Sequence, residues 1–161
     1  MNGEQRKFVW IQQAVSAVLN ALVSALFVWV MFGGLTAVEL WGKTGLAFDL
    51  VPTTFMITLM TAVALTLVTR AAVRNGQVPP LATSGLPLPR HLLLRAPLLA
   101  LAATMTLVPL SVGVLRSTWH GDWSYGAVMI FKIAYGVMLG AIITPIVIKA
   151  ALADPASTVA T

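Results

Sequence analysis

Four long apolar stretches, separated by short polar segments, are the feature that most limits how this 161-residue chain folds. They cover residues 8–32, 51–69, 96–115 and 125–148, and none of them contains an acidic residue. A helix crosses the hydrocarbon core of a bilayer with about 20 mostly apolar residues. The pattern therefore predicts an all-α integral membrane protein. Its four transmembrane helices would form two antiparallel hairpins and a four-helix bundle, with residues 1–161 as a single transmembrane domain.

The overall composition points to lipid as the solvent of this chain. Hydrophobic residues make up 58% of the sequence and charged residues only 9%, whereas a soluble domain carries about 25% charged residues. The net charge is +5, but the basic residues are few and most stand beside apolar stretches. That placement is typical of contact with anionic headgroups rather than with nucleic acid. The expected partner is the lipid bilayer, and no nucleic acid is expected.

Basic residues predict the orientation. Seven lie on one side of the predicted membrane: Arg6, Lys7, Arg70, Arg74, Arg90, Arg95 and Lys149. Only Lys43 and Arg116 lie on the other side, with Lys132 left out because it falls inside a span. Lys and Arg gather in cytoplasmic segments. The N- and C-termini are therefore expected in the cytoplasm, at the cell (inner) membrane, together with a proline-rich linker over residues 74–95.

Lys132, about two turns into the fourth span, is the sharpest single feature. A lysine at the bilayer centre costs about 2.5–3.5 kcal/mol on insertion scales, and the cost is lower at the shallower depth of Lys132. Two interpretations are open. Its side chain extends outward to the headgroups, or it pairs with an acid inside the bundle and lines a polar cavity. Asp49, at the start of the second span, is the natural partner, and Glu39 is the second choice. Asp49 and Pro52 are also expected to cap and begin the second helix.

Further candidate intramembrane positions follow from helical spacing. Lys132, Gly136 and Gly140 recur every four residues, and a Gly-x-x-x-Gly pair allows two helix backbones to approach closely. Asn20 belongs to a polar stripe on the first span, and Thr58 belongs to a threonine stripe on the second. Such stripes usually exchange hydrogen bonds between packed helices. A hydrophilic path is the alternative interpretation, and Asn20, near the middle of its span, is the residue that tests it.

The sequence predicts no catalytic, cofactor-binding or metal site. His120 and Asp122 are one residue apart, but two such ligands are weak evidence for a metal. The other histidine, His91, is expected on the opposite side of the membrane. A membrane enzyme needs clustered acids, histidines or a nucleophile–base pair, and the chain has no cysteine. We therefore expect no enzyme and no cofactor.

These features favour a non-enzymatic membrane subunit or accessory protein. It would associate through its helix faces, as a homo-oligomer or with another membrane protein. The alternative is a small permease-like transporter unit that acts as a homo-oligomer, with Lys132, Asn20 and the threonine stripe lining a path. Space for water around Lys132 and Asn20 would favour transport, whereas tight packing around both would favour the subunit.

Overall fold

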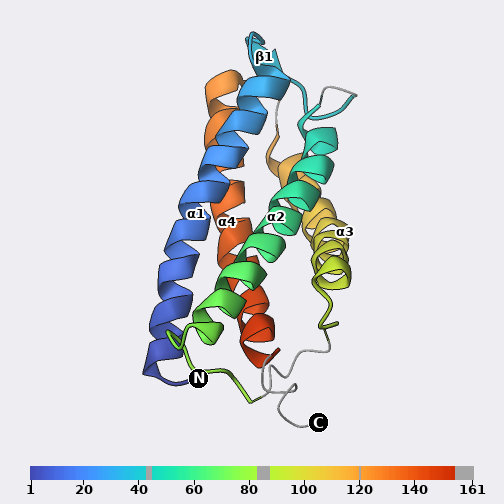
Figure 1. Ribbon diagram of the computed structural model, residues 1–161. Coiled ribbons are helices and arrows are strands. Elements are labelled where there is room, and N and C mark those ends of the chain that lie inside the picture. The colour runs from blue at the N-terminus through green and yellow to red at the C-terminus, as the bar shows by residue number, and fades with distance from the viewer. Residues whose placement is uncertain (43–44, 83–87, 120, 155–161) are drawn as a thin grey trace.

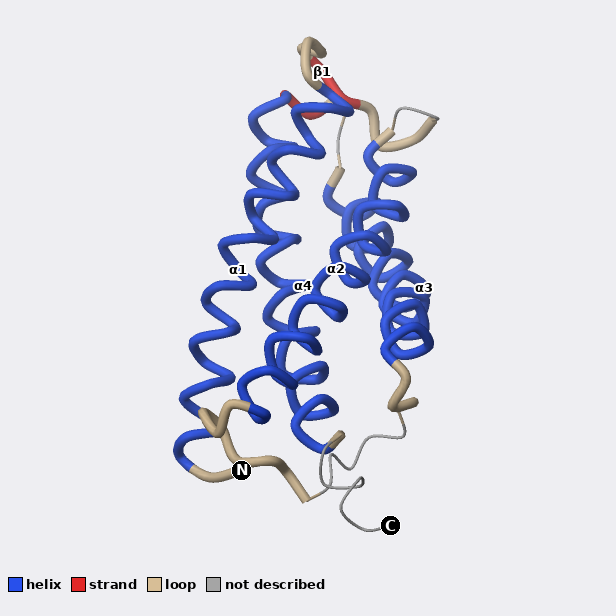
Figure 2. Tube along the Cα trace, viewed as in Figure 1, coloured by secondary structure: helices blue, strands red, loops and turns tan. Residues whose placement is uncertain are grey.

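The computed structural model describes residues 1–42, 45–82, 88–119 and 121–154. These residues form four long helices, α1 (Gly3–Phe32), α2 (Leu46–Arg74), α3 (Leu92–Thr118) and α4 (Tyr125–Ala153), and two short strands, β1 (Ala37–Val38) and β2 (Trp123–Ser124) (Figures 1 and 2). All four helices are long and apolar enough to cross a membrane. The prediction of an all-helical chain with four such helices is therefore confirmed.

Helix α4 lies at the centre of the bundle. It packs against α1 on one side and against α2 on the other, and α2 in turn packs against α3. Helices α1 and α2 follow each other in the sequence but contact each other only slightly. The first helix of the chain therefore packs mainly against the last (Figure 1).

Two ends of the bundle serve as landmarks below. At the β end, β1 pairs with β2 in antiparallel register, with Ala37 opposite Ser124 and Val38 opposite Trp123. This pairing joins the loop after α1 to the loop before α4. The opposite end, called the Arg70 end, holds the start of α1 and the end of α4 (Figure 2).

Local capping explains where two of the helices begin. Asn2 accepts a hydrogen bond from the backbone of Gln5, and the Gln5 side chain accepts one from the backbone of Asn2, which completes a capping box at α1. Ser124 caps α4 through the backbone N–H of Ala127. These side chains satisfy N–H groups that the first turn of a helix leaves without partners.

The prediction that Asp49 caps the second helix is wrong. Helix α2 begins at Leu46, after Gly45 as N-cap, and Asp49 stands inside its first turn. Gly45 makes no side-chain cap. The Asp49 carboxylate instead accepts hydrogen bonds from side chains of the bundle interior.

The predicted linker over residues 74–95 is shorter in the structure. Helix α2 continues to Arg74, and α3 begins at Leu92 and contains Pro97. Part of the connection is packed against the bundle rather than extended in solvent. The Gln5 side chain donates to the backbone oxygens of Pro79 and Pro80 at 3.0 and 3.3 Å.

The apolar core has two parts. The cluster near the β end includes Phe32, Leu46, Leu50 and Val128, all fully buried. The second cluster lies toward the Arg70 end; its members include Ala62, Val147, Ile148 and Leu152. The backbone N–H of Leu81 bonds the carbonyl of Leu152 at 2.8 Å, so the connection after α2 also closes over the end of α4.

Candidate functional site: a buried ion pair and its surroundings

Lys132 and Asp49 form an ion pair in the interior of the bundle. Both residues are almost fully buried, with 0% and 1% of their surface exposed. The Lys132 ammonium also donates to the Thr53 hydroxyl at 2.7 Å, and that hydroxyl donates to Asp49 at 3.3 Å. The pairing predicted from the sequence is therefore present, with Thr53 as a third member that the sequence did not single out.

The surroundings of this pair decide between the two interpretations of Lys132. The apolar cluster of Phe32, Leu46 and Val128 closes the bundle toward the β end. The Lys132 side chain consequently does not extend out to the surface. Since an uncompensated charge in such a place costs several kcal/mol, about 3–5 when one partner of a buried pair is removed, the two residues depend on each other.

A second polar group lies one turn further along both helices. The hydroxyls of Thr54 and Tyr135 are 2.7 Å apart, and Thr54 also donates to the carbonyl of Leu50 at 2.6 Å. Tyr135 additionally interacts with Ser111 of α3. Its ring stacks on Phe131 with a centroid distance of 6.0 Å. A second polar group, which joins α2, α3 and α4, therefore lies beside the ion pair.

Asn20 occupies a tight helix interface. Its side chain donates to Ser16 at 3.4 Å and accepts from Thr61 of α2 at 3.2 Å. It faces Gly140 of α4, where an added β-carbon would lie 2.7 Å from the Asn20 amide nitrogen. Gly136 approaches α1 even more closely, at Ser24. The polar stripe of the first span and the glycine pair of the fourth thus pack against each other.

Gln13 compensates for a proline in α4. Pro145 has no backbone N–H, so the carbonyl of Ala141 lacks the donor that a regular helix supplies four residues later. The Gln13 side chain donates to this carbonyl at 3.0 Å. One hydrogen bond between α1 and α4 therefore satisfies a backbone oxygen that the sequence of α4 leaves free.

An ionic cluster at the Arg70 end was not anticipated from the sequence. Asp154, which follows α4, accepts hydrogen bonds from Arg70 at 2.8 and 3.0 Å and from Arg95. Arg95 is 1% exposed and also donates to the carbonyl of Pro89 at 2.9 Å. The signal available was that Asp154 is the only acidic residue after the fourth apolar stretch. The cluster ties α2, α3 and the end of α4 together.

Thr58, the remaining candidate, is fully buried in α2. Within the described part of the chain, its hydroxyl has no hydrogen-bond partner. The same holds for four further buried hydroxyls: Ser24, Thr66, Thr69 and Thr144. Buried polar groups are normally hydrogen-bonded, so this group of side chains is the least explained feature of the interior.

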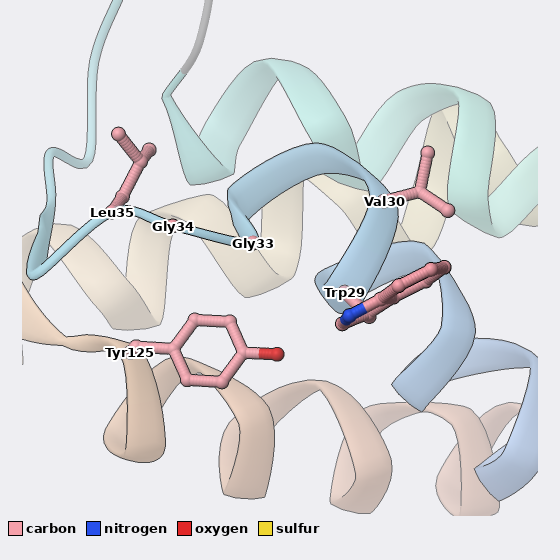
Figure 3. A pocket seen from close by; sticks show the side chains of 6 residues that line it. All are labelled: Trp29, Val30, Gly33, Gly34, Leu35 and Tyr125. Atoms are coloured by element: carbon pink, nitrogen blue, oxygen red, sulfur yellow. The ribbon is translucent and has the colours of Figure 1, made fainter.

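Three hollows lined by described residues do not include Lys132 or Asp49. The largest of these three, about 670 Å³, is an open one beside the end of α1, where Trp29 and Tyr125 face the same space (Figure 3). It contains no charged side chain. Two mainly apolar grooves run along the sides of the bundle: one of about 280 Å³ between α1 and α2, which Asn20 and Thr61 also line, and one of about 290 Å³ between α3 and α4, which Ser111 and Tyr135 also line. They form where helices adjacent in sequence hardly touch.

His91 is the N-cap residue of α3 without a side-chain cap, and His120 lies outside the described residues. Among the described residues, no three histidines, aspartates or glutamates are close enough to hold a metal ion.

Comparisons with protein-family models, with curated proteins and with solved structures each found no match to this chain.

Proposed function

We propose that this chain is a multi-pass protein of the cell membrane, with two antiparallel hairpins and with both termini in the cytoplasm. Four apolar helices support the insertion, and the seven-to-two distribution of basic residues supports the orientation. Within the membrane it acts as a non-enzymatic subunit or accessory protein. Its partner is a second copy or another membrane protein.

One observation carries this proposal. Lys132 and Asp49 contact other residues of the same chain in tight packing, and Asn20, which also lines the α1–α2 groove, hydrogen-bonds to Ser16 and Thr61. What the bundle presents outward is mainly apolar, including the two lateral grooves. A transmembrane helix associates mainly through van der Waals packing against small and apolar surfaces. The groove between α1 and α2 offers such a surface, with Gln12 and Val23 at its extremes on α1.

Extraction of the tagged protein in mild detergent, followed by mass spectrometry of stoichiometric partners, is the first test. The cysteine-free sequence allows site-specific crosslinking as the second. Leu19→Cys in the α1–α2 groove should crosslink to the partner. Leu26→Cys is the matched control, because Leu26 is equally exposed on the same helix, at 55%, and does not line that groove. Equal crosslinking at both positions would contradict docking at the groove.

The permease-like alternative, acting as a homo-oligomer, has one observation in its favour, namely the buried charge pair of Lys132 and Asp49. Intramembrane ionisable residues often mark transport pathways. Self-association with no other partner, together with solute flux that Lys132→Met abolishes in proteoliposomes, would replace the subunit proposal with this one.

A further inference from the structure

The buried hydroxyls without partners are not scattered at random along the bundle. On α2, Thr58 follows Thr54 by four residues, which is about 6 Å along the helix axis. Thr66 and Thr69 lie further toward the Arg70 end and are separated by about 4.5 Å along the axis. All four side chains are fully buried.

Thr144 on α4 lies level with the stretch of α2 between Thr61 and Thr66. Lys132 contacts Thr53 and Tyr135 contacts Thr54, so residues of α4 lie level with residues of α2 that are 79 and 81 positions earlier. By this offset, Thr144 lies level with about residues 63–65 of α2. Thr61, which bonds Asn20, lies just before this level. Hydroxyls therefore occur at nearly every turn between the ion pair and the Arg70 end.

The spacing suits bridging water molecules. Two O–H···O hydrogen bonds of about 2.8 Å each span up to about 5.6 Å, close to the axial steps between successive hydroxyls. Buried water typically occupies sites where two to four polar groups would otherwise lack partners. The unpartnered hydroxyls of Thr58, Thr66, Thr69 and Thr144 supply such groups.

The two ends of this row differ. At one end stands the Arg70–Asp154 ion pair, with 37% of the Arg70 side chain exposed. At the other end, the fully buried Leu46 and Leu50 belong to the apolar cluster near the β end. The second apolar cluster lies toward the Arg70 end, but there Thr66, Thr69 and the Arg70–Asp154 pair give water polar groups to follow.

We propose that the interior threonines bind a row of water molecules that hydrates the Lys132–Asp49 pair from the Arg70 end only. The bundle would then contain a one-sided aqueous path that stops at a buried ion pair. Water that reaches Lys132 is also what the permease-like alternative requires, so this inference goes beyond the subunit proposal. Its test is separate from the crosslinking test of the α1–α2 groove, and either can fail without the other.

Cysteine reactivity tests the path directly. A thiol reacts as its thiolate, and a thiolate forms where water is present. Single variants Thr69→Cys, Thr66→Cys and Thr58→Cys in vesicles should react with Ag⁺, a thiolate-binding cation similar in size to a water molecule, added on the Arg70 side. The rate should fall with distance from that end. Leu50→Cys, equally buried beside the ion pair but packed in the apolar cluster, should remain unlabelled from either side. Labelling of Thr66→Cys and Thr58→Cys no faster than that of Leu50→Cys would overturn the proposal.

A second variant tests whether the threonine hydroxyls bind the water that makes a cysteine at position 58 reactive. Thr66→Val in the Thr58→Cys background removes one water-binding group at constant shape and should reduce the labelling of residue 58 to the Leu50→Cys level. Thr106→Val is the control, because Thr106 of α3 already donates to its own helix backbone, and it should change nothing. An unchanged labelling rate of Thr58→Cys in the presence of Thr66→Val would refute the row of water molecules. If Thr58→Cys does not fold, Thr144→Cys probes the same path from α4. Chromatographic elution and helical circular dichroism verify each fold.

Discussion

Gly136 of α4 and Ser24 of α1 are so close that a β-carbon at position 136 would lie 2.1 Å from the Ser24 hydroxyl oxygen. It would also lie 2.8 Å from the backbone carbonyl oxygen of Asn20. The serine side chain can rotate away, but the backbone oxygen cannot. The absence of a side chain at Gly136 is therefore a condition for the contact between the first and the last helix.

Gly136→Ala should destabilise the bundle by about 1–3 kcal/mol, the usual cost of overpacking. Gly140→Ala should cost less, because the nearest atom there is the movable Asn20 amide nitrogen. Gly126→Ala is the matched control on the same helix, since nothing lies within 4 Å of its β-carbon position. Unfolding in mixed detergent micelles, followed by circular dichroism, measures the three variants. Equal stability of Gly136→Ala and Gly126→Ala would contradict the close packing.

Lys132→Met should destabilise the protein by about 3–5 kcal/mol, because it leaves the Asp49 carboxylate buried without its cation. Asp49→Asn should be destabilising for the reciprocal reason. The double variant should recover much of the loss, since no buried charge remains. A double-mutant cycle of unfolding free energies measures the coupling. Additive effects of the two single changes would show that the pair does not exist.

Gln13→Leu removes the donor to the Ala141 carbonyl and should cost about 0.6 kcal/mol, the average of measured intramembrane hydrogen bonds. The cost should shrink in a Pro145→Ala background, because residue 145 then supplies a backbone N–H to the same carbonyl. Unfolding free energies of the four proteins in this cycle test the idea. An identical cost in both backgrounds would refute the compensation.

Arg95→Met should destabilise the protein more than Arg70→Met does, although both arginines bind Asp154. Arg95 is buried, and its loss removes charged hydrogen bonds to Asp154 and should cost about 1.5–3 kcal/mol, because Asp154 keeps Arg70 as its partner. Arg70 is part-exposed, and exposed ion pairs contribute only about 0.2–1 kcal/mol. Thermal unfolding of the two variants at low and high salt distinguishes the buried contact from the exposed one, because salt screens the exposed pair more strongly. A larger loss for Arg70→Met would reverse this assignment.

The proposed orientation predicts that a reporter fused after residue 161 is active only if it works in the cytoplasm. A paired fusion within the loop between α1 and α2 should show the opposite behaviour. The physical reason is the retention of Lys and Arg segments on the cytoplasmic side. Activity of a periplasmic-type reporter at the C-terminal fusion would reject the topology.

The sequence predicted the Lys132–Asp49 contact because ionisable residues within apolar stretches are scarce. Few partners are available to Lys132, and Asp49 stands at a matching end of another stretch. Periodicity likewise predicted the faces of Asn20, Thr58 and the two glycines. These predictions need only the helical repeat and the cost of burying a charge. The functional roles proposed for these residues stay predictions.

Other features depend on tertiary packing that the repeat does not encode. Nothing in the α1 sequence shows that its polar stripe packs mainly against the glycines of α4, while Asn20 also bonds to α2. Asp154 lies just beyond the last apolar stretch, so its burial against Arg95 depends on how three helices converge. The start of α2 was misplaced because Asp49 has the residue type of a cap, yet its carboxylate binds Lys132.

The pairing of α1 with α4 also sets an order for biogenesis. A ribosome that adds about 5–20 residues per second needs several seconds to proceed from Phe32 to Tyr125. During that interval the Ser16, Asn20 and Ser24 side chains of the newly inserted first helix have no glycine-bearing neighbour to pack against. Under the proposed membrane insertion, a nascent chain interrupted before its last helix would therefore leave this polar stripe facing lipid. Completion of the chain and burial of the stripe become the same event.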